Sequence, residues 1–204
     1  MQTGRKGGIY HKIQVELTYN SNHMEGSRLT ADQTRYIFET NTIGVLKDET
    51  INVDDIIETS NHFRCIDLII ENRSKKLSEA FTKELHRVLK SGIYDSRKAW
   101  FAVGNYKKQL NKDGGEITEL PVEVHAGMRR LLSGYGNGRV GRLIMFKECL
   151  RFGVVPFIID ASIKLLYYNG LKNWDSQHGY LISTYQLAQD AFREMMGYFE
   201  ITEV

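Results

Sequence analysis

The sequence has little cysteine and no long apolar run. Its two cysteines, Cys65 and Cys149, lie far apart and have no C-x-x-C spacing or histidine-rich neighbourhood. A zinc site is therefore not expected, and reduced thiols in the cytosol are the default. No apolar stretch approaches the length of a membrane span, and the polar start at residues 2–8 is unlike a signal peptide. We expect a cytoplasmic protein without a membrane partner.

An excess of charge of one sign is also missing. The 204 residues carry 27 lysines and arginines against 25 aspartates and glutamates, a formal net charge of +2. This balance gives no excess of positive charge that would attract nucleic acid or an anionic membrane, so we expect neither as a partner. The length suffices for one domain with a sizeable core and a small N-terminal lobe. The sequence is compatible with a homo-oligomer and does not decide the oligomeric state.

Proline is almost absent, with two residues in the chain, and the apolar periodicity is mostly helical. Thr30 followed by Gln33 predicts a capping box at the start of one helix. Asp113 and Gly114 predict the turn of a small β-hairpin that pairs residues 100–103 with residues 117–120. We therefore expect an all-α fold with one hairpin. The predicted helices lie at about residues 30–38, 54–71, 78–90, 122–135, 139–151 and 180–199.

The most informative segment is a glycine-rich turn that is followed by two arginines and an apolar helical stretch. Glycine lets the backbone approach an anion, and the free N–H groups of a helix's first turn point at that anion with the helix dipole behind them. Two arginines three positions apart add forked, permanently charged donors for phosphate oxygens. The segment therefore predicts a cradle for two or more phosphates. Its residues are Gly136, Asn137, Gly138, Arg139, Val140, Gly141 and Arg142.

This segment resembles the second half of the signature of the Fic (Fido) family, His-Pro-Phe-x-Asp/Glu-Gly-Asn-Gly-Arg-x-x-Arg. Members of that family transfer AMP from ATP to hydroxyl side chains of other proteins. The chain matches from Gly136 onward, and further stretches over nearly its whole length are similar to bacterial members. It departs just before the match, because residues 131–135 read Leu-Leu-Ser-Gly-Tyr. Neither the family's catalytic histidine nor its magnesium-binding carboxylate stands there.

A second resemblance lies near the N-terminus, where Ser21, Glu25 and Gly26 fit the pattern Ser/Thr-x-x-x-Glu-Gly/Asn. In the family this segment is inhibitory, because its glutamate pairs with the last motif arginine in the place that the γ-phosphate needs. The resemblance implies a pair between Glu25 and Arg142. It also implies an N-terminal helical segment at residues 1–50 and a Fic core at residues 51–204. Read alone, Ser21 and Glu25 are four positions apart and could be an ordinary surface pair on a helix.

The resemblance assigns roles to further residues. Asn137, Gly138 and Arg139 would hold the α- and β-phosphates, and Arg142 would hold the γ-phosphate. ATP would be the substrate, accompanied by Mg²⁺, and the target would be a protein that the sequence does not identify; no metal-ligating residue is expected among those present. The other implied site residues are Gly136 and Gly141 at the nucleotide, Tyr167 and Tyr168 beside it or in the core, and Val103, Gly104, Ile117 and Leu120 in a flap that docks the target.

A replacement for the missing base is not evident among the histidines. His62, His86 and His125 have no carboxylate or nucleophile at a telling spacing, so we expect structural or exposed roles for them. His125 lies upstream of the glycine-rich turn, but nothing else favours it.

The junction between Tyr135 and Gly136 is short, because the family places a further helix and the histidine loop there. Three interpretations are open: a segment of roughly 20 residues is left out of this sequence, a deletion was engineered, or a natural protein lacks the histidine. We favour the first, since both flanks look intact and loss of a central helix would open a destabilising cavity. The predicted function is protein adenylylation inhibited through Glu25. The alternatives are an inactive nucleotide-binding pseudoenzyme and a Doc-like kinase.

Overall fold

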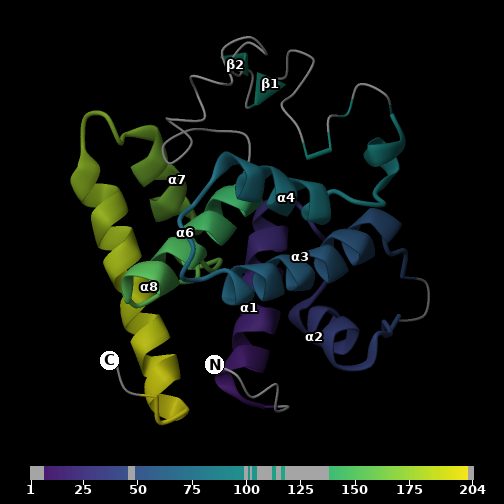
Figure 1. Ribbon diagram of the computed structural model, residues 1–204, viewed down its shortest axis with the longest axis horizontal. Coiled ribbons are helices and arrows are strands. Elements are labelled where there is room, and N and C mark those ends of the chain that lie inside the picture. The colour runs from purple at the N-terminus through teal and green to yellow at the C-terminus, as the bar shows by residue number, and fades with distance from the viewer. Residues whose placement is uncertain are drawn as a thin grey trace.

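The computed structural model describes residues 7–45, 49–98, 101, 103–104, 112–113, 116–117 and 138–201 of the chain. Helices dominate these residues, as Figure 1 shows. In chain order the elements are α1 (Ile9–Met24), α2 (Ala31–Thr40), α3 (Val53–Glu71), α4 (Glu79–Leu89), the 3₁₀ turn η1 (Tyr94–Arg97), β1 (Lys112–Asp113), β2 (Glu116–Ile117), α6 (Gly138–Phe152), α7 (Lys164–Lys172) and α8 (His178–Tyr198).

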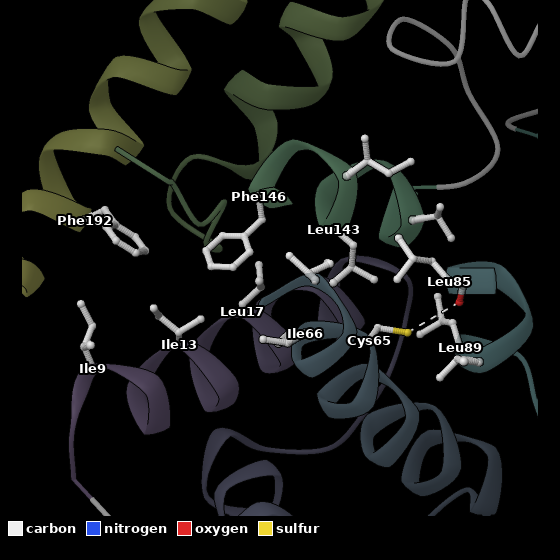
Figure 2. Packing of buried hydrophobic residues seen from close by; sticks show 14 residues of the cluster. Ile9, Ile13, Leu17, Cys65, Ile66, Leu85, Leu89, Leu143, Phe146 and Phe192 are labelled. Carbon is white, nitrogen blue, oxygen red and sulfur yellow. Dashed lines mark hydrogen bonds between the residues drawn. The ribbon is translucent and has the colours of Figure 1, made fainter. Parts of the chain in front are cut away.

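The main hydrophobic core lies where α1, α3, α4 and α6 meet, with α8 closing one end (Figure 2). Leu17 of α1, Ile66 of α3 and Leu143 of α6 are buried together there. Cys65 adds a thiol that donates to the backbone carbonyl of Leu85, with Sγ 3.6 Å from the oxygen. The segment that carries the two motif arginines is thus anchored from one side by the centre of the fold.

Two smaller clusters attach the remaining helices. In one, Leu29, Ile37 and Phe63 hold α2 against α3. In the other, Tyr167 of α7 and Leu181 of α8 pack with Met24, the last residue of α1. The pair of α7 and α8, coloured olive and yellow in Figure 1, therefore meets the C-terminal end of α1, where Glu25 follows.

Most of the predicted helices are confirmed, and their caps explain where they begin. Both halves of the capping box between Thr30 and Gln33 are present at α2. The side chains of Asn52 and Ser78 cap α3 and α4. After α6 the backbone turns at Gly153, whose φ of +66° suits glycine. The predicted helix at residues 122–135 lies outside the described residues.

The predicted hairpin partner at residues 100–103 is wrong for the residues that can be judged. The N–H of Val103 donates to the carbonyl of Phe101 two residues earlier, and Gly104 has a φ of +68°, so this stretch forms a turn. The antiparallel pairing that the structure describes places Lys112 opposite Ile117 and Asp113 opposite Glu116. A tight turn cannot also be extended strand, which is why the pairing starts later than predicted.

Two expectations from composition can be compared with the described residues. No helix there is long and apolar enough to cross a membrane. Cys65 and Cys149 are both free thiols, and burial raises their pKa to about 12 and about 11, respectively. Both thiols are therefore protonated and poorly reactive at neutral pH.

Candidate functional site

The site lies at the start of α6, whose first residue is Gly138. Gly136 and Asn137 precede it and lie outside the described residues. Arg139 and Arg142 both belong to the first turns of α6, and the structure places each of them against a carboxylate from another helix or its end. Gly141 lies between them, and a Cβ at this position would meet nothing within 4 Å.

Arg142 is held by the C-terminal end of α1. Its Nε donates to the hydroxyl of Ser21 at 3.0 Å, and its Nη2 donates to the carbonyl of Ser21 at 2.9 Å and to Oε1 of Glu25 at 2.8 Å. The Arg142 side chain is only 4% exposed, whereas that of Glu25 is 31% exposed. The structure therefore joins Ser21, Glu25 and Arg142, which the sequence pattern had placed in one interaction.

Gly138 shows how closely Glu25 approaches the start of α6. A Cβ built on Gly138 would overlap with Oε1 of Glu25 and would lie 2.9 Å from Nη1 of Arg142. Only glycine fits here without moving that carboxylate. The Glu25 carboxylate thus lies directly against the first residue of the helix, which is where the free N–H groups of a helix favour an anion.

Gly26 completes the turn that carries Glu25. Its φ is +96°, a backbone conformation that glycine adopts readily and other residues rarely do. The N–H groups of Glu25 and Gly26 donate to the carbonyls of Asn22 and His23. The chain therefore reverses immediately after Glu25, and this reversal holds the carboxylate at the end of α1.

Arg139 is held by a second carboxylate, Glu58 of α3. Its Nη1 and Nη2 donate to the two oxygens of Glu58, with the second contact at 3.0 Å, and Nη1 also lies 3.4 Å from Oδ1 of Asn22. The side chains of Arg139 and Glu58 are 11% and 12% exposed. Lys90, at the C-terminal end of α4, binds Glu58 as well.

Burial and neighbouring charges act in opposite directions on the pKa of Glu58. Burial alone would raise the pKa of Glu58, but hydrogen bonds and charge from Arg139 and Lys90 outweigh it and hold that pKa below its usual value. For Lys90, burial and the nearby Arg139 hold the pKa below its usual value, although Glu58 offsets part of this effect. Glu58 is therefore ionised at neutral pH and lies between the Arg139 and Lys90 side chains.

His62 is buried and His86 is half-buried, and each has one ring nitrogen at hydrogen-bond distance from a partner. Nδ1 of His62 lies 2.9 Å from the hydroxyl of Thr18, and burial together with Arg139 and Arg142 lowers its pKa to about 3. Nδ1 of His86 accepts the N–H of Gly104 at 2.9 Å, and burial together with Lys90 and Arg139 lowers its pKa to about 4. Both rings are neutral at pH 7, and we assign neither to proton transfer. His125 lies outside the described residues.

Of the remaining predicted site residues, the two tyrosines lie near the site, whereas the described flap residues lie elsewhere. Tyr167 is buried beside Arg142, which hydrogen-bonds its hydroxyl, and burial raises its pKa. The hydroxyl of Tyr168 lies 3.4 Å from the carbonyl oxygen of Met24. Of the predicted flap, Val103 and Gly104 lie in a turn near α4 and Ile117 lies in β2, whereas Leu120 is outside the described residues.

Glu58 and Lys90 were missed by sequence reasoning. A glutamate between Ile57 and Thr59 does not stand out, because charged residues on helices usually mark the solvated face. Lys90 follows a helix C-terminus, where a cation is common for the sake of the helix dipole alone. The described residues contain no group of three or more histidine, cysteine or acidic side chains that could hold a metal ion.

Comparison with known proteins links this geometry to a family. No protein-family model matches the chain. A curated relative, protein adenylyltransferase Fic from Nematostella vectensis, is 28% identical over 184 residues, covering 79% of this chain and 43% of that protein. The chain therefore spans less than half the length of this relative. The 184 aligned positions exceed the number of residues in the 79% of this chain that they cover. A relative with extra residues at the junction after Tyr135 would produce an excess of this kind.

Solved structures share the fold. A Fic domain containing signaling protein from Bacteroides thetaiotaomicron superposes with a TM-score of 0.70 at 22% identity, covering 89% of this chain and 83% of that one. Fic-1 from C. elegans superposes with a TM-score of 0.68 at 16% identity, covering 93% of this chain and 63% of that one. With the helical architecture, these likenesses show that the chain has the fold of Fic domain proteins, and in sequence it is similar to a curated Fic adenylyltransferase.

Proposed function

We propose that this domain binds ATP at the start of α6 as part of a protein adenylyltransferase, and that Glu25 inhibits this binding. The observation that carries the proposal is the position of the Glu25 carboxylate, which lies against Gly138 and accepts a hydrogen bond from Arg142. An arginine and the N-terminus of a helix are both suited to phosphate. A carboxylate in that place satisfies the same donors from within the chain.

The site is also suited to release this carboxylate. Glu25 receives a single hydrogen bond from Arg142, and its side chain is 31% exposed, so solvent can take over its charge. Arg142 keeps its two bonds to Ser21 when Glu25 leaves. A terminal phosphate can then accept the freed N–H of Arg142, with the first turn of α6 behind it.

In the proposed reaction, the hydroxyl oxygen of a target protein attacks the α-phosphorus of ATP. A P–O bond to the target forms, the bond to the bridging oxygen of the β-phosphate breaks, and pyrophosphate leaves. The hydroxyl proton needs a base, and residues 131–135, where the family's histidine segment would lie, hold no histidine. We therefore expect the 204-residue chain to bind ATP without transfer, and a form that carries the family's histidine loop to transfer AMP.

Mg²⁺ enters the proposal only as the counter-ion that accompanies ATP. The carboxylate that binds it in the family has no counterpart before Gly136, and the described residues offer no ligand cluster. No step is assigned to the metal. Use of ATP and the free thiols of Cys65 and Cys149 agree with a cytoplasmic protein.

The test is the affinity for ATP, measured by calorimetry for the parent chain and for Glu25→Gln. The amide keeps the shape of the carboxylate but removes its charge, so ATP should bind about tenfold more tightly. Glu16→Gln on the same helix is the control, because Glu16 pairs with Lys12 on the surface and should leave the affinity unchanged. Equal affinities of the parent and Glu25→Gln would contradict inhibition by Glu25.

A second candidate function, a nucleotide-binding pseudoenzyme, is favoured by the sequence at residues 131–135, which has no base. The intact mass of the natural protein separates the two: a mass equal to 23.5 kDa means that no segment is missing. In a form with the histidine loop, ATP labelled on the α-phosphate should label the target. Label transferred only from the γ-phosphate would instead indicate the kinase alternative.

A further inference from the structure

Arg139 has an arrangement that phosphate binding does not explain. Both of its terminal nitrogens are bound to Glu58, and one of them also lies against Asn22. We infer that Glu58 is a positioning residue of the phosphate site, which acts through Arg139 by fixing the first turn of α6, and that Arg139 is a tether and not itself a phosphate ligand. This inference rests on the proposed binding of ATP at the start of α6.

The contacts of Arg139 come from two other helices, and one of its partners is shared with a third. Glu58 belongs to α3, Asn22 to α1, and Lys90, which shares Glu58, caps the end of α4. Asn22 is itself fixed, because its amide donates to the hydroxyl of Thr59 at 3.2 Å. One guanidinium therefore ties the second residue of α6 to α1 and α3, and through Glu58 to the end of α4.

Burial makes this tether hard to release. The side chains of Arg139 and Glu58 are almost as shielded as the core, at 11% and 12% exposure. If Arg139 swung out to a phosphate, Glu58 would keep only Lys90, and a largely desolvated carboxylate would lose its two-point partner. Arg142, by contrast, can reach an anion without leaving its bonds to Ser21.

The tether can affect ATP because the first-turn N–H groups of a helix have no partners within the helix. Their direction depends on how the first turn is held. Arg139 lies one residue after Gly138, so its attachment to Glu58 sets the direction in which these groups point. A loosened first turn would present the same donors in many orientations, and a bound triphosphate would have to order them.

Electrostatics and positioning predict opposite results for Glu58→Gln. Removal of a negative charge beside Arg139 and Lys90 makes the site more positive, which by charge alone would strengthen ATP binding. Loss of the tether should weaken it, on the order of tenfold, as is typical for groups that act through a ligand-binding element. The sign of the change in affinity therefore separates the two.

The experiment uses Glu25→Gly as the parent, so that inhibition does not obscure binding. Glu58→Gln, Arg139→Gln and the double variant are added to it, and ATP affinity is measured by calorimetry. Hydrogen exchange at the amides of Leu143 and Ile144 is measured in the absence of ATP. Glu84→Gln is the matched control, because Glu84 makes the same two-point contact with Arg87 on the exposed face of α4.

We expect Glu58→Gln and Arg139→Gln to weaken ATP binding equally, and the double variant to be no weaker than either. Exchange at the start of α6 should be about tenfold faster in all three, and unchanged in Glu84→Gln. If Glu58→Gln does not fold, Glu58→Asp keeps the charge, is one methylene too short for the two-point contact, and should change both measurements in the same direction.

Unchanged or tighter ATP binding by Glu58→Gln would overturn the inference, and so would unchanged exchange at α6. A further loss of affinity from Arg139→Gln in the Glu58→Gln background would mean that Arg139 contacts phosphate directly, which also overturns it. If exchange accelerates but Glu25→Gly binds no ATP, the tether stands and the proposed function fails.

Discussion

The two arginines of α6 each bind a carboxylate, but the two pairs differ in burial, in bonding and in attachment. Arg142 donates one hydrogen bond to Glu25, which is 31% exposed and sits in a turn at the end of α1. Arg139 makes a two-point contact with Glu58, which is 12% exposed, lies within α3 and also binds Lys90. Opening the first pair moves Glu25 into solvent and leaves the buried Arg142 its two bonds to Ser21, whereas opening the second leaves both partners shielded without their two-point contact.

The largest expected effect comes from breaking the buried pair. Glu58→Ala leaves Arg139 and Lys90 as neighbouring cations with little solvent, so we expect unfolding to become easier by about 3–5 kcal/mol. Glu25→Ala should cost less, about 1–3 kcal/mol, because Glu25 is partly exposed and the buried Arg142 keeps both bonds to Ser21. Urea unfolding of both variants measures the difference. Equal losses would show that the two pairs are energetically alike.

The next prediction concerns the pH dependence of stability, through the buried His62 near both arginines. The pKa of His62 is lowered to about 3 by burial and by Arg139 and Arg142, from an ordinary 6.5. Below pH 6.5 the unfolded chain therefore binds a proton that the folded chain refuses, so the stability present above pH 6.5 declines as the pH falls toward 3. Between pH 7 and pH 5 this group should contribute a loss of about 2 kcal/mol.

His62→Gln tests this by removing the titrating ring while keeping a partner for Thr18. The fall in unfolding free energy between pH 7 and pH 5 should then be smaller by that amount. His178→Gln, at the exposed start of α8, is the control and should leave the slope unchanged. An unaltered slope in His62→Gln would mean that His62 is protonated inside the fold.

The smallest expected change in stability comes from the contact between Gly138 and the Glu25 carboxylate. Gly138→Ala places a methyl group against the Glu25 carboxylate, which should destabilise the protein by about 1 kcal/mol. In the Glu25→Gly background most of this loss should disappear, since the obstructing carboxylate is gone. Gly141→Ala meets nothing within 4 Å and should be neutral or slightly stabilising. If Gly138→Ala is equally destabilising in both backgrounds, Glu25 is not the obstacle.

The helices with clear apolar periodicity and side-chain caps could be predicted from the sequence. Ser78 and the apolar spacing after it locate α4, and Thr30 with Gln33 locates α2. The 16-residue helix α1 was expected only through the family resemblance, as part of a helical segment at residues 1–50. Its apolar periodicity did not reveal it, because its inward face carries the polar side chains of Gln14, Thr18 and Asn22, all buried. Such a face weakens the hydrophobic pattern on which helix prediction depends.

Some residues of the candidate site could be predicted from the sequence, and others could not. The glycines and arginines of residues 136–142 suggested an anion site on physical grounds, and the family pattern suggested the contact between Glu25 and Arg142. Nothing in the sequence pointed to Glu58 or Lys90, since their contact with Arg139 arises only when α3, α4 and α6 pack together. Partners that come from distant helices leave no local spacing to recognise.

The turn after α1 makes Glu25 an intramolecular ligand of the site. A tethered group competes at an effective concentration fixed by its attachment, commonly millimolar for a short, flexible link and higher for a rigid one. Here the attachment is one end of a helix that is anchored in the core by buried residues such as Ile13 and Leu17. On the proposed function, the ATP concentration at half-occupancy is therefore set by the stiffness of this turn as much as by the phosphate contacts, so a change at Gly26 alone should shift that threshold.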